Sequence, residues 1–363
     1  MKILVVSDSF KGTLSSSEIG SMVQEILQPQ HQVDYLAVSD GGEGFIEAMQ
    51  EENRGELRTL NCNDPLGRTI LAGYLMIDRE RAVVESAKVC GLGLLARREL
   101  NPMLTGTFGL GQMIIDAVAT GARMLYVGLG GSATNDGGAG MLRALGVRFY
   151  DSNGLELHDE GGQILERIHH IDDSALPAVL TRVKICAVCD VDNPLLGSRG
   201  ATMVYGSQKG ASAGMLKQLE QGMRNFVSVA EKGGKTTHHL PGSGAAGGLG
   251  FAFRHFLNAE IVPGIEVLIR EKKLNEKLHD YDLIITGEGK LDMQTRSGKV
   301  PMGILKLGQQ CGKPVICLCG VNELPHNPGF SAIHAVVPRY ATLDESISNP
   351  RLTLLTLLNS VNF

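Results

Sequence analysis

A glycine-rich stretch between an apolar run and a helix-forming run is the feature that most restricts the fold of this chain. The stretch is Gly128-Leu-Gly-Gly-Ser-Ala-Thr-Asn-Asp-Gly-Gly-Ala-Gly140, in which six of thirteen residues are glycine. Residues 124–127 predict a buried strand before it, and residues 141–145 predict the first turns of a helix after it. A strand, a loop and a helix in this order are typical of α/β proteins.

The residues of this loop predict that it binds an anion. Backbone N–H groups at the start of a helix carry partial positive charge and suit a phosphate group. Glycine lets a ligand approach the backbone closely. The side chains of Ser132, Thr134, Asn135 and Asp136 add hydrogen-bonding partners. The alternative is a tight turn without a ligand, for which so many glycines are not needed.

Length and charge limit the classes of protein to consider. A chain of 363 residues is too long for one ordinary core, so two domains are expected. Its 46 glycines follow no period, which indicates many functional loops rather than a fibrous protein. A net charge of −5 and the absence of tryptophan argue against a general nucleic-acid or membrane-surface binder. The expected partners are therefore small molecules.

The cysteines predict a reducing compartment. There are seven, an odd number, and the pairs Cys186/Cys189 and Cys317/Cys319 lie inside apolar runs. Buried strand cysteines are expected rather than zinc ligands, because no second pair stands at zinc-site spacing. The apolar run within residues 1–6 is too short for a signal peptide. No apolar run approaches eighteen residues, so we expect a cytoplasmic protein.

The order of predicted elements indicates an α/β fold with two domains. Strand, loop and helix alternate in about the first 60 residues and again after residue 275, whereas the pattern between them is mixed. We therefore predict one discontinuous parallel-sheet domain, residues 1–60 plus 275–363, with a second mixed α/β domain, residues 61–274, inserted into it. Ser15 and Glu18 form a capping-box pattern that predicts the start of the first helix.

Four acidic loops follow predicted strands and suggest phosphoryl transfer. They contain Asp8, then Asp40 and Glu43, then Asp190 and Asp192, then Glu288 and Asp292. Magnesium prefers such oxygen ligands, and phosphoryl transfer also needs a group that orients the attacking hydroxyl. Positive charge for the moving phosphate is available from Lys11, Lys290 and Lys299. A turn or helix cap is the alternative for any single acid, but it explains four such loops less well.

A dinucleotide site is a competing interpretation of the glycine loop. Residues 128–133 fit the pattern G-x-G-x-x-A, and Asp151 follows at about the distance of a ribose-binding acid. However, a Rossmann helix should already be running at Thr134, where the chain has the poor helix formers Asn135 to Gly138. Residues 289–299 also lack the spacing of a Walker P-loop.

Seven motifs occur in the same order as in the type I glycerate kinases, which this sequence resembles over residues 3–337. The motifs are Asp8-Ser-Phe-Lys-Gly12, Asp40-Gly-Gly-Glu-Gly44, Gly130-Gly-Ser-Ala-Thr-Asn-Asp-Gly-Gly138, Cys189-Asp-Val-Asp-Asn-Pro-Leu-Leu-Gly197, Gln208-Lys-Gly-Ala211, Gly244-Ala-Ala-Gly-Gly-Leu-Gly250 and Gly287-Glu-Gly-Lys-Leu-Asp292. Seven ordered motifs are far more specific than any one glycine loop.

The resemblance implies a two-domain enzyme, one domain flavodoxin-like, that uses Mg-ATP to phosphorylate D-glycerate. It also implies a place in bacterial sugar-acid and glyoxylate metabolism, with 2-phosphoglycerate as the expected product. A homodimer is left open. We expect in-line transfer in the cleft between the two domains. The residues expected to bind the ATP phosphates are Gly130, Gly131, Ser132, Thr134, Asn135, Asp136, Gly137 and Gly138.

The acidic loops and their lysines supply the other expected roles. Asp292 or Asp190 is expected to orient or deprotonate the substrate hydroxyl. Lys11 and Lys290 are expected to hold the glycerate carboxylate or the transferring phosphate. The remaining expectations are Asp8, Ser9 and Lys299 for substrate binding and Asp40, Glu43 and Glu288 for magnesium, directly or through water.

Some positions depart from the family pattern. Lys290 stands where arginine is common, and Met293 stands where a small residue is usual. Ser7 and Ser207 replace prolines, and Thr295-Arg-Ser-Gly-Lys299 replaces Ser-x-His-Gly-Lys. The positive charges at residues 290 and 299 are kept, so activity is expected. Substrate preference is less constrained, because lysine lacks the bidentate grip of arginine on a carboxylate.

Three alternatives stay open at this point. One is a glycerate kinase that forms 3-phosphoglycerate. Another is an NAD-dependent dehydrogenase of a hydroxy acid, which NADH binding would reveal. The third is a non-catalytic sugar-acid sensor, which would bind glycerate without ATP turnover. The acidic and lysine loops argue against the sensor, since a binding-only protein has no need of magnesium-type ligands.

Overall fold

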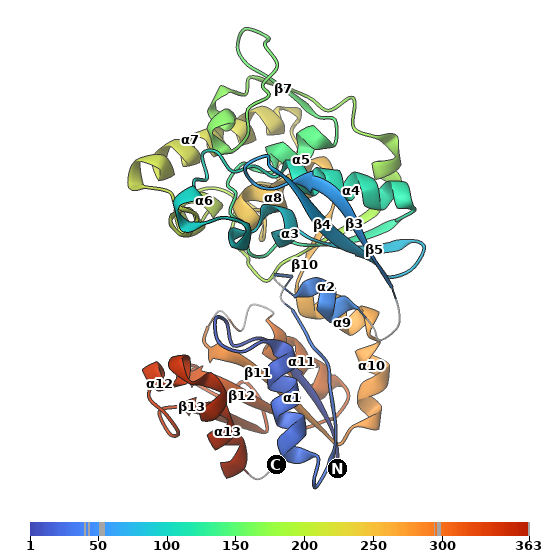
Figure 1. The fold of residues 1–363 in the computed structure, drawn as a ribbon, viewed down its shortest axis with the longest axis vertical. Helices are drawn as coiled ribbons and strands as arrows, with labels where there is room; N and C mark the ends of the chain where they lie inside the picture. The colour runs from blue at the N-terminus through green and yellow to red at the C-terminus, as the bar shows by residue number, and fades with distance from the viewer. Residues whose placement is uncertain (40, 43, 51–54, 294, 296–298, 362–363) are drawn as a thin grey trace. The chain divides into compact units, whose positions relative to one another are not determined.

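The chain forms two compact units. The computed structural model describes residues 1–39, 41–42, 44–50, 55–293, 295 and 299–361. The first unit consists of Met1–Asp40, Glu47–Met49 and Pro263–Phe363, and the second of Gly41–Ile46 and Gln50–Val262. The first is thus built from both ends of the chain, drawn in blue and in orange to red in Figure 1. The structure has the chain leave the first unit after Met49 and return to it at Pro263. The boundaries predicted near residues 60 and 275 are each about ten residues later in the sequence than these.

The first unit contains a five-stranded parallel sheet. Its strand order is β13-β12-β11-β1-β2. The strands are β1 (Lys2–Ser7), β2 (Gln32–Tyr35), β11 (Leu283–Leu291), β12 (Val315–Asn322) and β13 (Ala332–Val337). Renumbered within this unit, the order is 2-1-3-4-5, which is the flavodoxin-like arrangement. The α/β class and the flavodoxin-like sheet predicted from the sequence are therefore confirmed.

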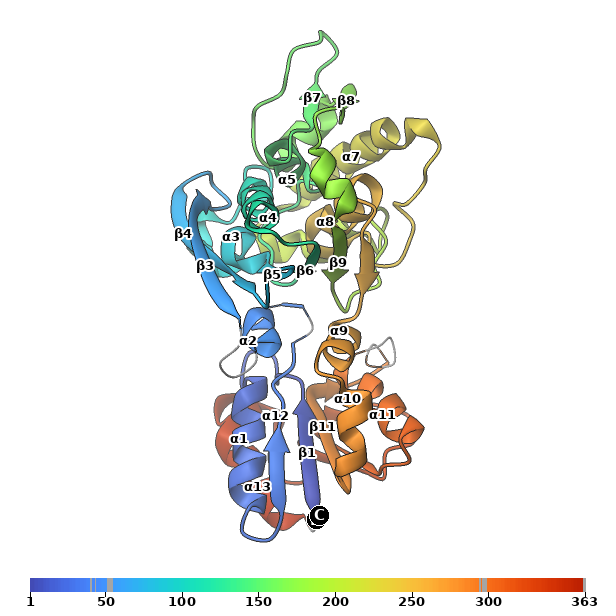
Figure 2. The same cartoon turned by 90° about the vertical axis from the view of Figure 1, so that its right-hand side faces the viewer.

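Helices cover both faces of this sheet, as Figure 2 shows for α1 and α13 on one face and α10 and α11 on the other. The helices of the unit are α1 (Ser16–Leu27), α9 (Gly264–Glu271), α10 (Leu274–Lys277), α11 (Val300–Gln310), α12 (Leu343–Ser348) and α13 (Pro350–Ser360), and α2 (Phe45–Met49) connects the two units in sequence. The predicted capping box is confirmed, because Ser15 Oγ accepts from Glu18 N and Glu18 Oε2 accepts from Ser15 N.

The second unit contains a six-stranded mixed sheet. Its order is β10-β9-β6-β5-β4-β3, with β10, β9, β6 and β5 parallel and the β5-β4 and β4-β3 pairs antiparallel. The strands are β3 (Glu56–Asn63), β4 (Thr69–Met76), β5 (Arg81–Glu85), β6 (Met124–Gly128), β9 (Lys184–Val188) and β10 (Glu260–Val262), and β7 (Arg148–Tyr150) pairs with β8 (His170–Asp172) in a separate ribbon.

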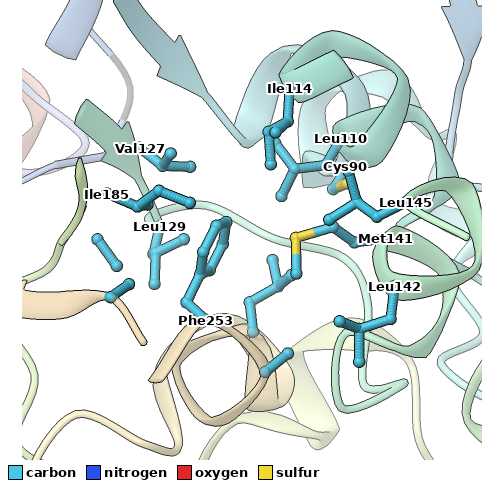
Figure 3. Close-up of a cluster of buried hydrophobic side chains, with 14 of the residues drawn as sticks. Cys90, Leu110, Ile114, Val127, Leu129, Met141, Leu142, Leu145, Ile185 and Phe253 are labelled. Carbon is cyan, nitrogen blue, oxygen red and sulfur yellow. The ribbon is translucent and has the colours of Figure 1, made fainter. Parts of the chain in front are cut away.

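The core of the second unit lies between this sheet and its helices. The helices are α3 (Ala87–Cys90), α4 (Phe108–Thr120), α5 (Ala139–Ala144), α6 (Ala201–Tyr205), α7 (Ala213–Ala230) and α8 (Ala245–Phe256). Figure 3 shows Val127 of β6 and Ile185 of β9 facing Ile114 of α4, Met141 of α5 and Phe253 of α8. All five are buried, so the glycine loop between β6 and α5 is fixed at both ends by the core.

The structure corrects one prediction about local structure, for residues 287–291, and a second, that the leucines at 352, 354, 355, 357 and 358 form a core-facing stripe of a helix. Residues 287–291, predicted as a loop, continue strand β11, because Glu288 and Lys290 pair with Cys319 and Val321 of β12. The leucine-rich helix α13 buries Leu354, Leu357 and Leu358, but Leu352 is 65% exposed and does not face the core.

The cysteines are free, as the sequence predicts. Cys186, Cys189, Cys317 and Cys319 are buried thiols within or directly after strands. Free cysteine is among the most buried residue types, so the burial of these four thiols is ordinary. Among the described residues, no helix has the length and apolar character needed to cross a membrane.

Candidate functional site

Three parallel strands of the second unit bring the predicted loops to one edge of the sheet. In register, Glu85 at the end of β5 pairs with Gly128 of β6, and Gly128 pairs with Val188 of β9. Ser86, the glycine loop and Asp190 follow these strands directly. Ligands of α/β proteins bind at the carboxyl ends of parallel strands. This edge is therefore the candidate site of the second unit.

The first glycines of the loop are explained by close backbone packing. A Cβ atom on Gly130 would lie 2.2 Å from Gly42 Cα, and one on Gly128 would lie 2.5 Å from Gly41 O. Gly130 N also donates to Gly41 O at 3.0 Å. Two of the six glycines are thus required by the contact between two chain segments, whether or not the loop binds an anion.

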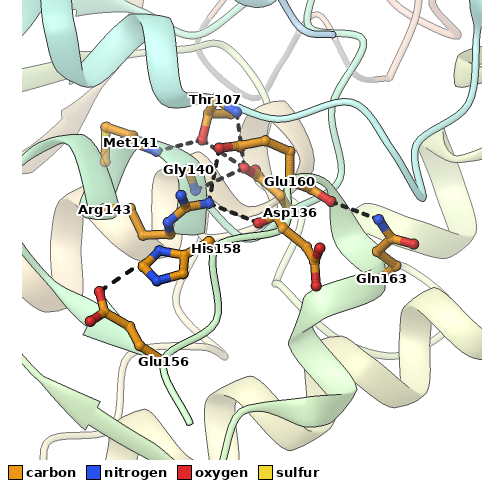
Figure 4. Close-up of polar contacts among 10 residues, drawn as sticks. Thr107, Asp136, Gly140, Met141, Arg143, Glu156, His158, Glu160 and Gln163 are labelled. Atoms are coloured by element: carbon orange, nitrogen blue, oxygen red, sulfur yellow. Dashed lines mark hydrogen bonds and ion pairs between the residues drawn. The ribbon is translucent and has the colours of Figure 1, made fainter. Parts of the chain in front are cut away.

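Asp136 binds the backbone at the start of α5. Its carboxylate accepts from Gly138 N at 3.0 Å, Gly140 N at 3.1 Å, Thr107 N at 3.0 Å and Thr107 Oγ at 2.7 Å. Thr107 Oγ accepts from Met141 N, so its own proton is directed to Asp136 (Figure 4). Burial raises the pKa of the Asp136 carboxyl, and these four donors oppose that rise.

The helix start therefore already holds an anion from the chain itself. Asp136 is completely buried, and residues 133–140 are buried with it. The sequence predicts that Gly138 and the helix start face a nucleotide, but the amides of Gly138 and Gly140 point at Asp136 instead. Only Gly130 and Gly131 reach the surface, with Ser132 beside them at 5% exposure. An external phosphate would meet this first part of the loop.

Lys209 is a residue that the sequence motif contained but to which no role was given. It lies in a short 3-10 helix, Ser207–Lys209, and is 2% exposed. Its Nζ donates to Ser132 Oγ at 3.0 Å and to Thr134 O at 2.6 Å. The signal that could have found it is a lysine between two glycine-rich motifs. Its burial depends on tertiary packing.

Unsatisfied polar atoms also lie in the buried part of this edge. The hydroxyls of Ser86 and Thr134 and Oδ1 of Asn135 are buried and have no hydrogen-bond partner among the described residues. Asn135 is fixed on its other side, since its Nδ2 donates to Thr202 Oγ at 3.0 Å. Buried polar groups are almost always paired. Orphaned atoms here are expected of a site that completes its hydrogen bonds with a ligand or water.

A second buried carboxyl lies next to this network. Glu160 Oε1 accepts from Arg143 at 2.9 Å, while its Oε2 is buried without a partner among the described residues. Burial, with a smaller contribution from the charge of Asp136, raises the pKa of Glu160 to about 7 against the opposing effect of Arg143. Figure 4 shows Glu160 beside Asp136 and Thr107.

The Glu160→Gln variant is expected to change how stability depends on pH. The pKa of Glu160 is higher in the folded protein than in the unfolded chain, so the fold binds more protons between about pH 4.5 and pH 7. Stability from this group is thus present at low pH and is lost as pH rises through about 7. We expect the variant to be less destabilised, relative to wild type, at about pH 8 than at about pH 5. Urea unfolding at both pH values measures this, and an equal difference at both would contradict it.

In the first unit, the edge where β1 and β11 end holds the other predicted residues. Ser7 pairs in register with Gly287, so the next residues of the two segments are Asp8, directly after β1, and Glu288, within β11. This pair of strands is the switch point of a flavodoxin-like sheet, where ligands bind. Asp8 is buried and its Oδ1 accepts from Ser9 N at 2.7 Å. Gly289 allows the turn at Phe10 to pack closely against β11, since a Cβ atom on residue 289 would lie 3.2 Å from Phe10 Cα.

Glu288 is the centre of a small polar group at this edge. It is 4% exposed, accepts from the Thr295 hydroxyl and forms an ion pair with Lys299 at 3.5 Å. The Thr295 hydroxyl in turn accepts from Asp292 N at 3.0 Å. Burial raises the pKa of Glu288, and Thr295 and Lys299 oppose the rise. The structure therefore brings Glu288, Asp292 and Lys299 together.

The other predicted lysines are at the surface. Lys290 pairs with Glu323 at 2.9 Å, and both side chains are about half exposed. Lys11 is exposed in the turn after β1. An exposed ion pair contributes little to stability, so Lys290 can leave Glu323 at small cost. Asp40 and Glu43, predicted to bind magnesium, lie outside the described residues.

Of the two predicted acids after β9, Asp190 is half-buried, whereas Asp192 is exposed and lies 3.9 Å from Arg199.

The dinucleotide interpretation loses its structural support. Helix α5 begins only at Ala139, and Asp151 Oδ1 accepts from Asn153 N and Leu155 N of its own turn. Asp151 therefore stabilises a turn.

Comparison with known proteins decides the family. The sequence matches the glycerate kinase family model over residues 3–362. The chain belongs to the glycerate kinase family. It is 38% identical to the glycerate 2-kinase of Escherichia coli K12 and 38% identical to a glycerate kinase of Halalkalibacterium halodurans, each over 95% of this chain and 93% of the relative.

A solved structure agrees with this assignment to the glycerate kinase family. A crystal structure from Salmonella typhimurium LT2, titled as a glycerate kinase 2, matches with a TM-score of 0.81 and 35% identity. The match covers 99% of this chain and 98% of that one. The resemblance found from the seven motifs is confirmed, and this protein is an enzyme of the kinase class.

Proposed function

We propose that this enzyme transfers the γ-phosphoryl group of ATP to D-glycerate and forms 2-phospho-D-glycerate. The observation that carries this proposal is the family match along nearly the whole chain, together with a relative named glycerate 2-kinase. It is supported by the polar residues that stand at the carboxyl ends of parallel strands in both sheets. The location of the active site between the domains, the cytoplasmic location of the protein and its assembly as a homodimer stay predictions.

In the second unit, we propose that ATP phosphates bind at Gly130, Gly131 and Ser132. Gly130 and Gly131 form the accessible part of the loop and Ser132 adjoins them, and the rest of the loop, through Asp136, holds their backbone in place. Asp190 stands at the same edge, one of two candidates for orienting the substrate hydroxyl. Thr134, Asn135, Gly137 and Gly138 would then support the site from below, a change from the role predicted for them.

In the first unit, we propose that Asp8, Ser9, Lys11 and Lys299 bind the substrate. Lys299 already lies beside a carboxylate, that of Glu288, and is 25% exposed, so a substrate anion can reach it. Asp292 is the second candidate for the hydroxyl, and Lys290 would neutralise the transferring phosphate after leaving Glu323. Two acids that follow different strands, Asp190 after β9 and Asp292 after β11, are thus the candidates for accepting this proton.

Magnesium fits this donor set. The buried Glu288 carboxyl supplies hard oxygen ligands, and a divalent cation would favour its ionised form against the effect of burial on its pKa. No group of three or more His, Cys, Asp or Glu suited to a metal occurs among the described residues, but magnesium bound with ATP needs only one or two carboxylates. When bound, it would neutralise charge on the phosphates.

The test is the reaction itself. We expect the purified enzyme to consume ATP only with D-glycerate and Mg²⁺ present, and phosphorus NMR to identify 2-phosphoglycerate. A 3-phosphoglycerate product would keep the kinase and overturn the position of transfer. Glycerate binding without turnover would favour the sensor, and NADH binding would favour the dehydrogenase.

A further inference from the structure

Lys209 is a buried lysine whose ammonium group has no carboxylate partner in the part of the chain that the structure describes. Among the described residues, its Nζ contacts only Ser132 Oγ and Thr134 O. The nearest acid of the loop, Asp136, already accepts four hydrogen bonds from Thr107, Gly138 and Gly140. Burying a lysine in this way is costly, and such a residue is rarely kept for packing alone.

The contact with Lys209 fixes the direction of the Ser132 hydroxyl. An ammonium group can only donate, so Ser132 Oγ is the acceptor of this hydrogen bond. The proton of the same hydroxyl must then point away from Lys209. In the sequence, Ser132 comes directly after the exposed Gly131 and directly before the buried residues 133–140. The donor is therefore available next to the accessible part of the loop.

We propose that Lys209 is a positioning residue for the nucleotide, which holds Ser132 so that its hydroxyl donates to a phosphate group bound at Gly130, Gly131 and Ser132. The same contact to Thr134 O keeps the loop in the conformation that presents Ser132. This inference rests on the proposed binding of ATP at this loop. It adds Lys209 as a buried residue that supports the loop through Ser132 and Thr134.

The charge of Lys209 links this role to pH. Burial lowers the pKa of Lys209 to about 7, and the two groups that face it, Asp136 on the loop and the Cys90 thiol of α3, oppose this effect. A neutral amine would accept from Ser132 and turn the hydroxyl proton inward. A phosphate bound nearby favours the charged form. Nucleotide binding is therefore expected to take up protons above about pH 7 and to weaken as pH rises.

The first test is the Lys209→Met variant, with Lys217→Met on the exposed face of α7 as its matched control. Methionine fills similar space but cannot donate. We expect the KM for ATP to rise about 10-fold or more, as for loss of a hydrogen bond from a charged donor. The KM for D-glycerate is expected to stay within about twofold, since the change is confined to the nucleotide. An unchanged KM for ATP would overturn the proposal.

The second test is calorimetry of a non-hydrolysable ATP analogue in buffers of different ionisation enthalpy. At about pH 8 we expect wild type to take up nearly one proton more per nucleotide than Lys209→Met, a difference that a purely structural role would not produce. Equal proton uptake would overturn the proposal. If Lys209→Met does not fold, Ser132→Ala must weaken nucleotide binding, and unchanged binding by that variant would overturn the proposal. No nucleotide binding by wild type would refute the proposed function instead.

Discussion

The Asp136→Ala variant is expected to lose about 3 kcal/mol or more of unfolding free energy. The substitution leaves three buried backbone N–H groups and the Thr107 hydroxyl without their acceptor. Each buried donor left unpaired costs about 1–3 kcal/mol, and partial rearrangement offsets some of this sum. The loss is large because one carboxylate binds the starts of both α4 and α5.

Denaturant unfolding measured by circular dichroism tests this expectation, with Asp159→Ala as the control. Asp159 is about half exposed and forms a surface ion pair with Arg167, so its loss should change stability by less than about 1 kcal/mol. In Asp136→Ala, the backbone amides of residues 107–110 and 138–141 should exchange their hydrogens faster than in wild type. A loss below about 1 kcal/mol would mean that Asp136 does not hold the two helices.

The second large effect is expected on catalysis, from Asp190→Asn and Asp292→Asn made separately. If one of these carboxylates orients or deprotonates the glycerate hydroxyl, its amide form should lower kcat by about 10²-fold or more, with little change in KM. Asparagine keeps the size of the side chain and removes its ability to take a proton. Steady-state kinetics with ATP and D-glycerate separates the two candidates.

Asp192→Asn is the control for this comparison. It lies two residues from Asp190, is exposed and, among the described residues, forms an ion pair with Arg199 at 3.9 Å. Its kcat should stay within about twofold of wild type, as expected of a surface charge.

If neither Asp190→Asn nor Asp292→Asn lowers kcat by about 10²-fold, both assignments of the general base fail.

The sequence predicted what depends on local pattern. The period of apolar residues located most strands and helices, and Ser15 and Glu18 located the start of α1. The same patterns correctly placed Asp8 and Asp190 after strands, whereas Glu288 lies within β11 rather than in the predicted loop. The motif order was specific enough to identify the family.

The rest depends on contacts between distant residues. Thr107 and Asp136 are separated by 29 positions, so no local pattern shows that Asp136 points into the fold and occupies the helix start. The burial of Lys209 beneath Ser132 is likewise set by residues 77 positions apart. Glycine has more than one use, and the sequence alone does not separate close packing at Gly128 from ligand binding at Gly131.

The path of the chain near residue 41 bears on modularity. Gly41–Ile46 belongs to the second unit, whereas Glu47–Met49 belongs to the first. Gly41 packs against Gly128 and Gly130, and Ile46 N donates to Glu85 Oε2 at 3.3 Å. A fragment that starts at Gln50 would lack this segment and leave Gly130 without its neighbour. The second unit is therefore not a transplantable module defined by one continuous stretch, and any shuffling of it between proteins must carry residues 41–46 along.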